Sequence, residues 1–132
     1  MENRQIRTVV IPDMSTASVN LLRVPTGHSY TVEDAWATTN VDIAANGTVY
    51  DTVALVNGGT AGTSTTAISG TAGGTAGWSK NVAQEMAIIS AKGKLTAGQW
   101  LVAQFAKNGS PTAAAMSITV EFMDGIGYKA NS

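Results

Sequence analysis

The chain has 132 residues, no cysteine, and a net charge of −1 from eight basic and nine acidic side chains. A chain of this length forms one ordinary domain, and without cysteine it holds neither a disulfide nor a thiolate metal site. So weak a net charge provides no footprint for nucleic acid, and no apolar run approaches the length of a membrane span. We therefore expect neither nucleic acid nor a membrane as a partner. Charged residues make up only 13% of the chain, which favours a surface covered by other protein.

The N-terminal stretch combines two arginines with a short apolar run. It lacks the apolar core of a signal peptide, so we expect synthesis in the cytoplasm without export. We interpret residues 1–14 as an extended arm that adds a strand to the open sheet edge of a neighbour. The alternative is an ordinary first strand of the same domain. The arm residues expected to contact the partner are Arg4, Ile6, Arg7, Val9, Val10 and Ile11.

Two short β candidates, Ile6–Ile11 and Val19–Val24, come first in the chain and are closed by Pro12 and Pro25. The single histidine, His28, follows in a turn. One imidazole is too few for a usual zinc site, and a catalytic histidine also needs a nucleophile and an orienting carboxylate. We interpret His28 as a solvated turn residue.

Asn-Gly dipeptides suit the positive φ angles of tight hairpin turns. The first of three, Asn46-Gly47, separates Tyr30–Ile43 from Thr48–Val56, and this arrangement predicts a hairpin. The next, Asn57-Gly58, ends a strand and opens a Gly/Thr/Ala-rich stretch.

That stretch runs from Gly58 to Trp78, repeats the tetrapeptide GTAG three times and contains no charge. The repeats recur at irregular offsets and bring no hydrophobic face, so they do not indicate a solenoid. A structureless loop of this length is unusual inside a domain. We therefore predict a loop–strand–loop, in which Thr65–Ser69 is a short strand with Ile68 pointing inward and Trp78 anchors the return.

Glu85–Lys92 (EMAIISAK) predicts a further strand because it contains two adjacent isoleucines. A helix over Ala83–Ala91 is the alternative, since Ala, Gln, Glu and Met are good helix formers. A turn is expected around Lys92-Gly93-Lys94.

The last two predicted strands, Gln99–Ala106 and Met116–Phe122, alternate apolar and polar residues, so each has one buried face. The residues expected on the buried faces are Leu101, Ala103 and Phe105 in the first strand and Met116, Ile118, Val120 and Phe122 in the second. Asn108-Gly109 lies between the two strands and predicts that they pair as an antiparallel hairpin.

About eight short strands, regular turn signals and no long helix predict an all-β fold. Mostly long-range pairing favours a jelly roll over a meander. We expect a single antiparallel β-sandwich, jelly-roll-like, over residues 15–132, preceded by the extended arm of residues 1–14.

No constellation with catalytic chemistry is recognisable. The glycines match neither a phosphate loop nor a dinucleotide fingerprint, and no calcium loop is present. The adjacent carboxylates Glu33 and Asp34 are expected on opposite faces of a strand. We therefore expect no enzyme, no metal and no cofactor. Trp36, Trp78 and Trp100 suggest either core and interface packing or a sugar-stacking platform.

Several segments in a fixed order carry a family resemblance. A polar-basic arm is followed by Thr31–Trp36 (TVEDAW), by the Gly/Thr/Ala-rich middle, by Leu95–Val102 (LTAGQWLV) and by Ser117–Phe122 (SITVEF). From about Tyr30 to Phe122 the chain resembles the small head decoration (cement) proteins of tailed bacteriophages. The resemblance implies a jelly-roll or β-sandwich domain that forms trimers on the outer capsid surface and staples neighbouring capsid subunits, without enzymatic activity.

We therefore expect a virion structural protein that decorates the outside of a bacteriophage capsid. Its expected partners are the major capsid protein and two further copies of itself, with Arg4 and Arg7 against an acidic capsid exterior. One alternative is a phage tail, fibre or knob component. Another is a carbohydrate-binding, adhesin-like module with Trp36, Trp78 or Trp100 as its stacking platform.

Overall fold

The computed structural model describes residues 3–12, 18–109 and 114–125. Every regular element in these ranges is a β-strand, and no helix of a length that could cross a membrane occurs in them. The strands are β1 (Arg4–Ile11), β2 (Ser18–Arg23), β3 (Tyr30–Thr39), β4 (Tyr50–Asn57), β5 (Thr66–Ala67), β6 (Ala72–Gly73), β7 (Gln84–Glu85), β8 (Lys94–Leu95), β9 (Trp100–Asn108) and β10 (Met116–Asp124). The predicted all-β class is confirmed.

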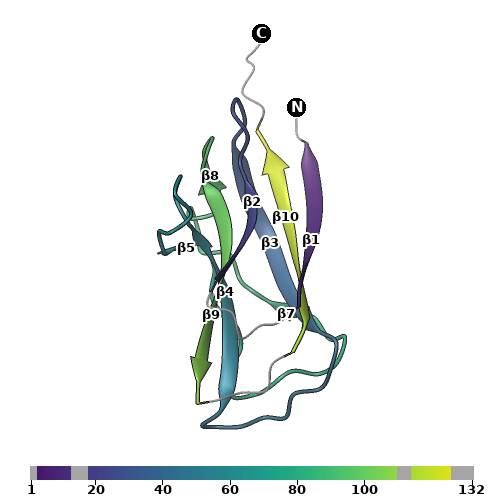
Figure 1. The fold of residues 1–132 in the computed structure, drawn as a ribbon. Helices are drawn as coiled ribbons and strands as arrows, with labels where there is room; N and C mark the ends of the chain where they lie inside the picture. The colour runs from purple at the N-terminus through teal and green to yellow at the C-terminus, as the bar shows by residue number, and fades with distance from the viewer. Residues whose placement is uncertain (1–2, 13–17, 110–113, 126–132) are drawn as a thin grey trace.

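Two antiparallel sheets pack face to face (Figure 1). Sheet A has the order β1-β10-β3-β7, with β8 also paired to β3. Sheet B has the order β2-β9-β4-β5, with β6 also paired to β4. Among the long strands, β1, β3 and β10 lie in sheet A whereas β2, β4 and β9 lie in sheet B, so the chain crosses between the sheets after β1, β2, β3 and β9. This winding is that of a jelly roll, so the predicted jelly-roll-like sandwich is confirmed.

The core between the sheets is built from the alternating apolar faces that the sequence predicts. The inward residues of β10 and β9 are all buried: Met116, Ile118, Val120 and Phe122 on one strand, and Leu101, Ala103 and Phe105 on the other. Full burial of one large apolar side chain contributes about 1.5–3 kcal/mol. The sandwich therefore needs no disulfide or metal to be stable.

Both predicted Asn-Gly hairpins are wrong. Strands β9 and β10 flank Asn108-Gly109 but lie in different sheets, and so do β3 and β4 on either side of Asn46-Gly47. Gly109 does have a positive φ of 73°, and the Asn108 side chain donates to the carbonyl of Thr48 at 3.0 Å. These dipeptides therefore redirect the chain from one sheet towards the other. An Asn-Gly dipeptide predicts that the chain turns, but it does not predict which strands pair with each other.

The described part of the N-terminal stretch is a strand of the sandwich. β1 pairs with β10 along its whole length, from Arg4 opposite Met123 to Ile11 opposite Met116, and Ile11 is fully buried. For Arg4–Ile11, the alternative of an ordinary first strand describes the structure better than a separate arm. Residues 1–2 and 13–14 of the predicted arm lie outside the described residues.

The Gly-rich stretch contains two short strands, β5 and β6, where the sequence predicted the single strand Thr65–Ser69. β5 covers Thr66–Ala67, the adjacent Ile68 is fully buried, and Trp78 is buried at the return. Trp78 forms a β-bridge with Ile43. Gly73 allows this packing, since a Cβ there would lie 2.6 Å from the Trp78 ring.

The predicted strand Glu85–Lys92 is much shorter than expected, and the helical alternative over Ala83–Ala91 is wrong. Only Gln84–Glu85 form β7, after which the chain turns at Ala91, whose φ is +65°. Met86 is fully buried, and beyond β7 separate backbone contacts, such as the β-bridge between Ile88 and Ser69, hold this segment in place of a continuous ladder.

Candidate functional site: the open edge of the sandwich

Strand β1 has β10 on one side and, among the described residues, no strand on the other. The amide of Asp124 donates to the carbonyl of Asn3 at 2.8 Å. In an antiparallel ladder this bond sets the phase, so that the odd-numbered residues of β1 direct their N–H and C=O groups to β10. The even-numbered residues direct theirs to the open side. We call these four residues the β1 edge: Arg4, Ile6, Thr8 and Val10.

The side chains of the β1 edge lie on the outer face of sheet A. Ile6 is 63% exposed and Val10 is 67% exposed, so both present apolar surface to the outside. Between them, Thr8 Oγ1 and Thr119 Oγ1 are 2.9 Å apart and share a hydrogen bond. A shallow hollow of about 130 Å³ adjoins Val10 and is lined in part by Ser117. The β1 edge thus combines backbone groups that have no partner among the described residues with the exposed apolar side chains of Ile6 and Val10.

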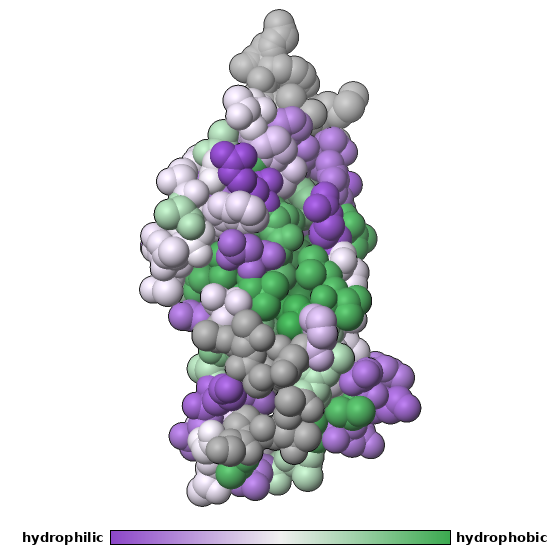
Figure 2. Space-filling model, in the orientation of Figure 1, coloured by the Kyte–Doolittle hydropathy of each residue, from purple (hydrophilic) through white to green (hydrophobic). Residues whose placement is uncertain are grey.

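On the side of the sandwich bordered by β1 and β2, the described residues leave several apolar side chains only half-buried. Val9 on β1 and both Val19 and Leu21 on β2 are only half-buried. Figure 2 shows a continuous hydrophobic area in the middle of this face. Apolar area gathered at one place on a surface marks sites of protein contact more often than scattered residues do.

Arg4 is neutralised within the chain. Its Nη1 lies 2.8 Å from Glu121 Oε1 and 3.4 Å from Glu33 Oε1. The pairs are solvent-exposed and contribute less than about 1 kcal/mol. They nevertheless compensate the charge that the sequence assigned to an acidic capsid exterior, so Arg4 is a weaker candidate for that contact than expected.

The expectation that Glu33 and Asp34 point to opposite faces is wrong. A register shift between Glu121 and Phe122 of β10 marks a β-bulge at this point of β3. Val32 and Ala35 are both buried with two residues between them, and this is only compatible with an extra residue in the strand. Glu33 is therefore exposed and Asp34 half-buried on the outer side.

Arg7 belongs to the odd-numbered set of β1 and lies opposite the buried Val120. Its guanidinium is close enough to affect the buried Tyr30 phenol. Burial raises the pKa of Tyr30, the Asp124 carboxylate raises it further, and Arg7 acts in the opposite direction. A charge on the inward side of an edge strand is a recognised guard against uncontrolled edge pairing.

His28 is not a solvated turn residue. Its Nδ1 lies 2.9 Å and 3.0 Å from the two carboxylate oxygens of Asp124, whose side chain is only 4% exposed. The ring also packs edge-on against Tyr30. The neighbouring Ser29 donates its hydroxyl to the carbonyl of Gly125. These contacts join the β2–β3 turn to the end of β10, so the role of His28 here is structural.

The three tryptophans do not come together in one platform. Trp78 is buried in the core. Trp36 is half-buried on the outer face of sheet A, opposite Thr119 and Glu85. Trp100 is half-buried on the outer face of sheet B, opposite Arg23. A shared sugar-stacking surface made by all three is thus ruled out by their placement.

Sequence reasoning missed a hollow on the outer face of sheet B, between the loop Gly62–Thr65 and strands β2 and β9. Its signal was the glycine-rich composition of the loop, which lets the backbone lie flat on a sheet. No group of three or more His, Cys, Asp or Glu side chains that could hold a metal occurs in the described ranges.

No family model matches the chain, and no curated protein matches it. Among solved structures, the chain is similar to one from "Cyanophage Pam1 capsid asymmetric unit", with a TM-score of 0.52 and 14% sequence identity. The match covers 92% of this chain and 85% of that chain. At this identity the likeness concerns the fold.

Proposed function

We propose that the chain is a structural protein of a bacteriophage virion. The observation that carries the proposal is the likeness of fold, over nearly the whole of both chains, to a chain of a cyanophage capsid. A jelly roll by itself hosts many functions. The resemblance of the sequence to phage head decoration proteins is independent of the fold comparison and points to the same kind of particle.

Within the virion, we propose a place on the outer capsid surface, where the protein binds the major capsid protein and bridges neighbouring subunits. The β1 edge supports this role because its unpaired backbone groups can accept a strand from a capsid subunit. Ile6 and Val10 beside them supply apolar contacts. The protein would act by binding alone, after synthesis in the host cytoplasm.

We propose a homotrimer as the binding unit. The half-buried Val19 and Leu21 and the hydrophobic area of Figure 2 offer a surface on which copies can associate. Three linked edges would convert a weak single contact into firm attachment, because the second and third contacts form at high effective concentration.

Sedimentation with expanded, undecorated capsids of the same phage tests the proposal. The protein should pellet with the capsids and stay in the supernatant without them. Protein that remains in the supernatant with capsids present contradicts the decoration role. Light scattering on the free protein tests the trimer separately, and a monomer at the concentrations used for sedimentation contradicts that part.

A further inference from the structure

The loop Gly58–Ser64 lies on the outer face of sheet B and is held there by backbone hydrogen bonds. Gly58 N donates to Trp100 O at 2.9 Å, and Trp100 N donates to Gly59 O at 3.0 Å. Within the loop, Ser64 N donates to Gly58 O at 2.9 Å. These hydrogen bonds hold the loop against the sheet, where it forms a fixed wall.

Glycine is required where this wall meets the sheet. A Cβ on Gly58 would lie 2.7 Å from Val102 Cγ2, closer than real Cβ contacts allow. Gly62 has a φ of +77°, in the region that favours glycine. The uncharged Gly/Thr/Ser composition of the stretch thus lays hydroxyl-bearing residues directly over two strands.

The wall encloses a hollow of about 260 Å³. Its floor is apolar, because Val56 and Val102 are almost fully buried beneath it. Its rim carries hydroxyl and amide groups on Ser18, Thr63, Ser64, Thr65 and Gln104. Ser18, Thr65 and Gln104 make no side-chain hydrogen bond within the described part of the chain. Their donors and acceptors are therefore available to a bound molecule.

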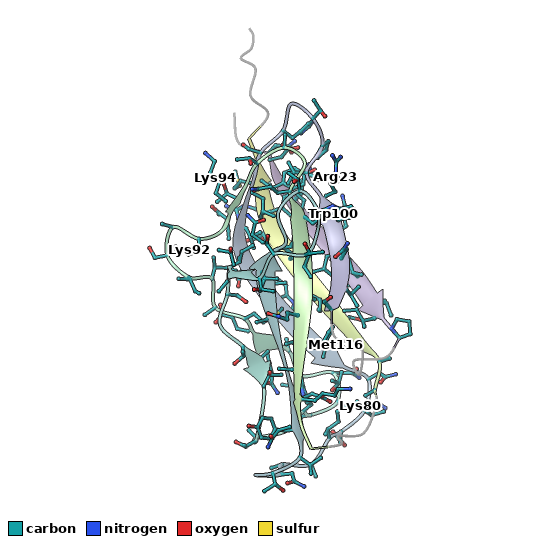
Figure 3. All side chains as sticks on the ribbon, turned by 60° about the vertical axis from the view of Figure 1, so that its left-hand side comes forward. Arg23, Lys80, Lys92, Lys94, Trp100 and Met116 are labelled. Atoms are coloured by element: carbon teal, nitrogen blue, oxygen red, sulfur yellow. The ribbon has the colours of Figure 1, made fainter. Side chains whose placement is uncertain are left out.

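An aromatic ring contacts the loop that forms the wall of the hollow. A Cβ on Gly62 would lie 3.4 Å from Trp100 Cδ1 and 3.1 Å from Asn20 Nδ2, so the loop touches both side chains. Trp100 is half-buried on this outer face, and Figure 3 shows it near Arg23 at the same end of the sandwich.

The surface around the hollow contains no carboxylate among the outward residues of β2, β9 and β4. These residues are Ser18, Asn20, Arg23, Trp100, Val102, Gln104, Ala106, Asn108, Tyr50, Thr52, Ala54 and Val56. The side chains that line the hollow are all uncharged, and a rim with many hydroxyl and amide groups suits a neutral polyhydroxyl ligand.

We propose that this hollow binds a neutral saccharide. One sugar ring would lie on the exposed part of Trp100 with its apolar C–H face. The sugar hydroxyls would exchange hydrogen bonds with Asn20, Gln104 and the hydroxyls of the loop. The fixed loop lowers the ordering cost of binding. This site lies on sheet B, and it is independent of capsid attachment through β1.

Nuclear magnetic resonance titration with maltohexaose, cellohexaose and chitohexaose, each at millimolar concentration, tests the proposal. At least one of the three should shift the Trp100 indole resonance together with the amides of Thr63 and Gln104. No saturable shift at these residues with any of the three overturns the proposal. A shift confined to Trp36 on the other sheet also overturns it.

Variants separate the site from the fold. Trp100→Ala should weaken binding at least about tenfold, and Trp36→Ala is the matched control that should leave it unchanged. Because Trp100→Ala removes packing under the loop, Gln104→Ala provides a second variant on an exposed residue and should weaken binding several-fold. Unchanged binding in Gln104→Ala and Trp100→Ala overturns the assignment. A further variant, Thr63→Trp, is designed to fill the hollow. If it blocks capsid binding but leaves saccharide binding intact, the hollow is a protein contact and the proposal is overturned.

Discussion

Strands β1 and β2 border the same side of the sandwich, and among the described residues each has a hydrogen-bonded strand on one side only. β1 has eight residues in unbroken register with β10. β2 has six residues, and its register with β9 shifts between Asn20 and Leu22. A bulge and a short length are two ways in which proteins make an edge unsuitable for further pairing. β2 is thus a blunted edge, whereas β1 keeps the regular geometry that strand addition requires.

The outward side chains also favour β1 over β2 as a binding edge. β1 exposes Ile6 and Val10, whereas β2 exposes Ser18 and Asn20. An exposed, regular and partly apolar edge is an aggregation hazard in a free monomer. Its presence here is explained if β1 is covered by a partner in the assembled particle, and this is the central claim of the capsid-binding proposal.

Removal of β1 should have the largest effect. A chain lacking residues 1–11 loses the buried Ile11 and the whole ladder to β10, so it should be unfolded at room temperature. Circular dichroism and proteolysis measure this. As a graded version, Ile11→Ala should cost about 2–5 kcal/mol of unfolding free energy. The half-buried Val19→Ala on β2 should cost about 1 kcal/mol. A folded truncated chain would mean that β1 is a detachable arm.

Thr8→Pro should weaken capsid binding about 100-fold, because it removes one outward N–H and places a ring in the path of an added strand. Proline is tolerated at an edge where the N–H faces solvent, so the melting temperature should fall only slightly. Thr8→Val keeps the N–H and should bind like the unmodified protein. Ser18→Pro, at the first residue of β2, should also bind normally. Equal losses of capsid affinity in Thr8→Pro and Ser18→Pro would contradict the claim that β1 binds capsids and β2 does not.

The exposed apolar side chains of β1 should contribute less to capsid affinity than its backbone groups. Ile6→Thr and Val10→Thr keep β-branched side chains but remove apolar area. Each should weaken capsid binding by about fivefold to tenfold with little change in stability. Quantitative sedimentation at several protein concentrations measures the affinities. If either variant loses as much affinity as Thr8→Pro, capsid binding depends on side-chain contacts and not on backbone pairing with an added strand.

The smallest effect concerns alkaline pH. The folded-state pKa of Tyr30 is raised mainly by burial, and the unfolded phenol titrates near about 10. Its contribution to stability is therefore complete below about pH 10 and is lost as pH rises through the folded pKa. Arg7 on β1 lowers this pKa, so Arg7→Gln should raise it further. Titration of the Tyr30 ring carbon by NMR measures both values. An unchanged pKa in Arg7→Gln would show that the Arg7 guanidinium does not act on the phenol.

The sequence predicted what local alternation determines, namely the strand faces around Ile118 and Leu101 and the inward Ile68. The number of short strands and the spacing of the turn signals also predicted an all-β sandwich of the jelly-roll kind, without its strand pairing. These features follow from burial of one face of each strand, which leaves a period of two in the residues themselves.

The sequence could not predict features that depend on distant residues. The pairing partners beyond Asn46-Gly47 and Asn108-Gly109 are chosen by how two whole sheets pack. The bulge at Glu33 depends on its register with β10. The contact of His28 joins residues 96 positions apart in the chain. The candidate site was likewise only partly predictable, because the composition of Arg4–Ile11 suggested a strand but did not reveal which of its edges stays open.

Hydrogen–deuterium exchange of the β1 amides, with and without undecorated capsids, tests the central claim most directly. In the free protein the outward amides of Ile6, Thr8 and Val10 should exchange fast and those of Arg7 and Val9 slowly. Bound to capsids, the three outward amides should become protected while the Asn20 region of β2 stays unchanged. Protection at β2 with no change at Ile6, Thr8 and Val10 would contradict the claim that the β1 edge is the attachment site.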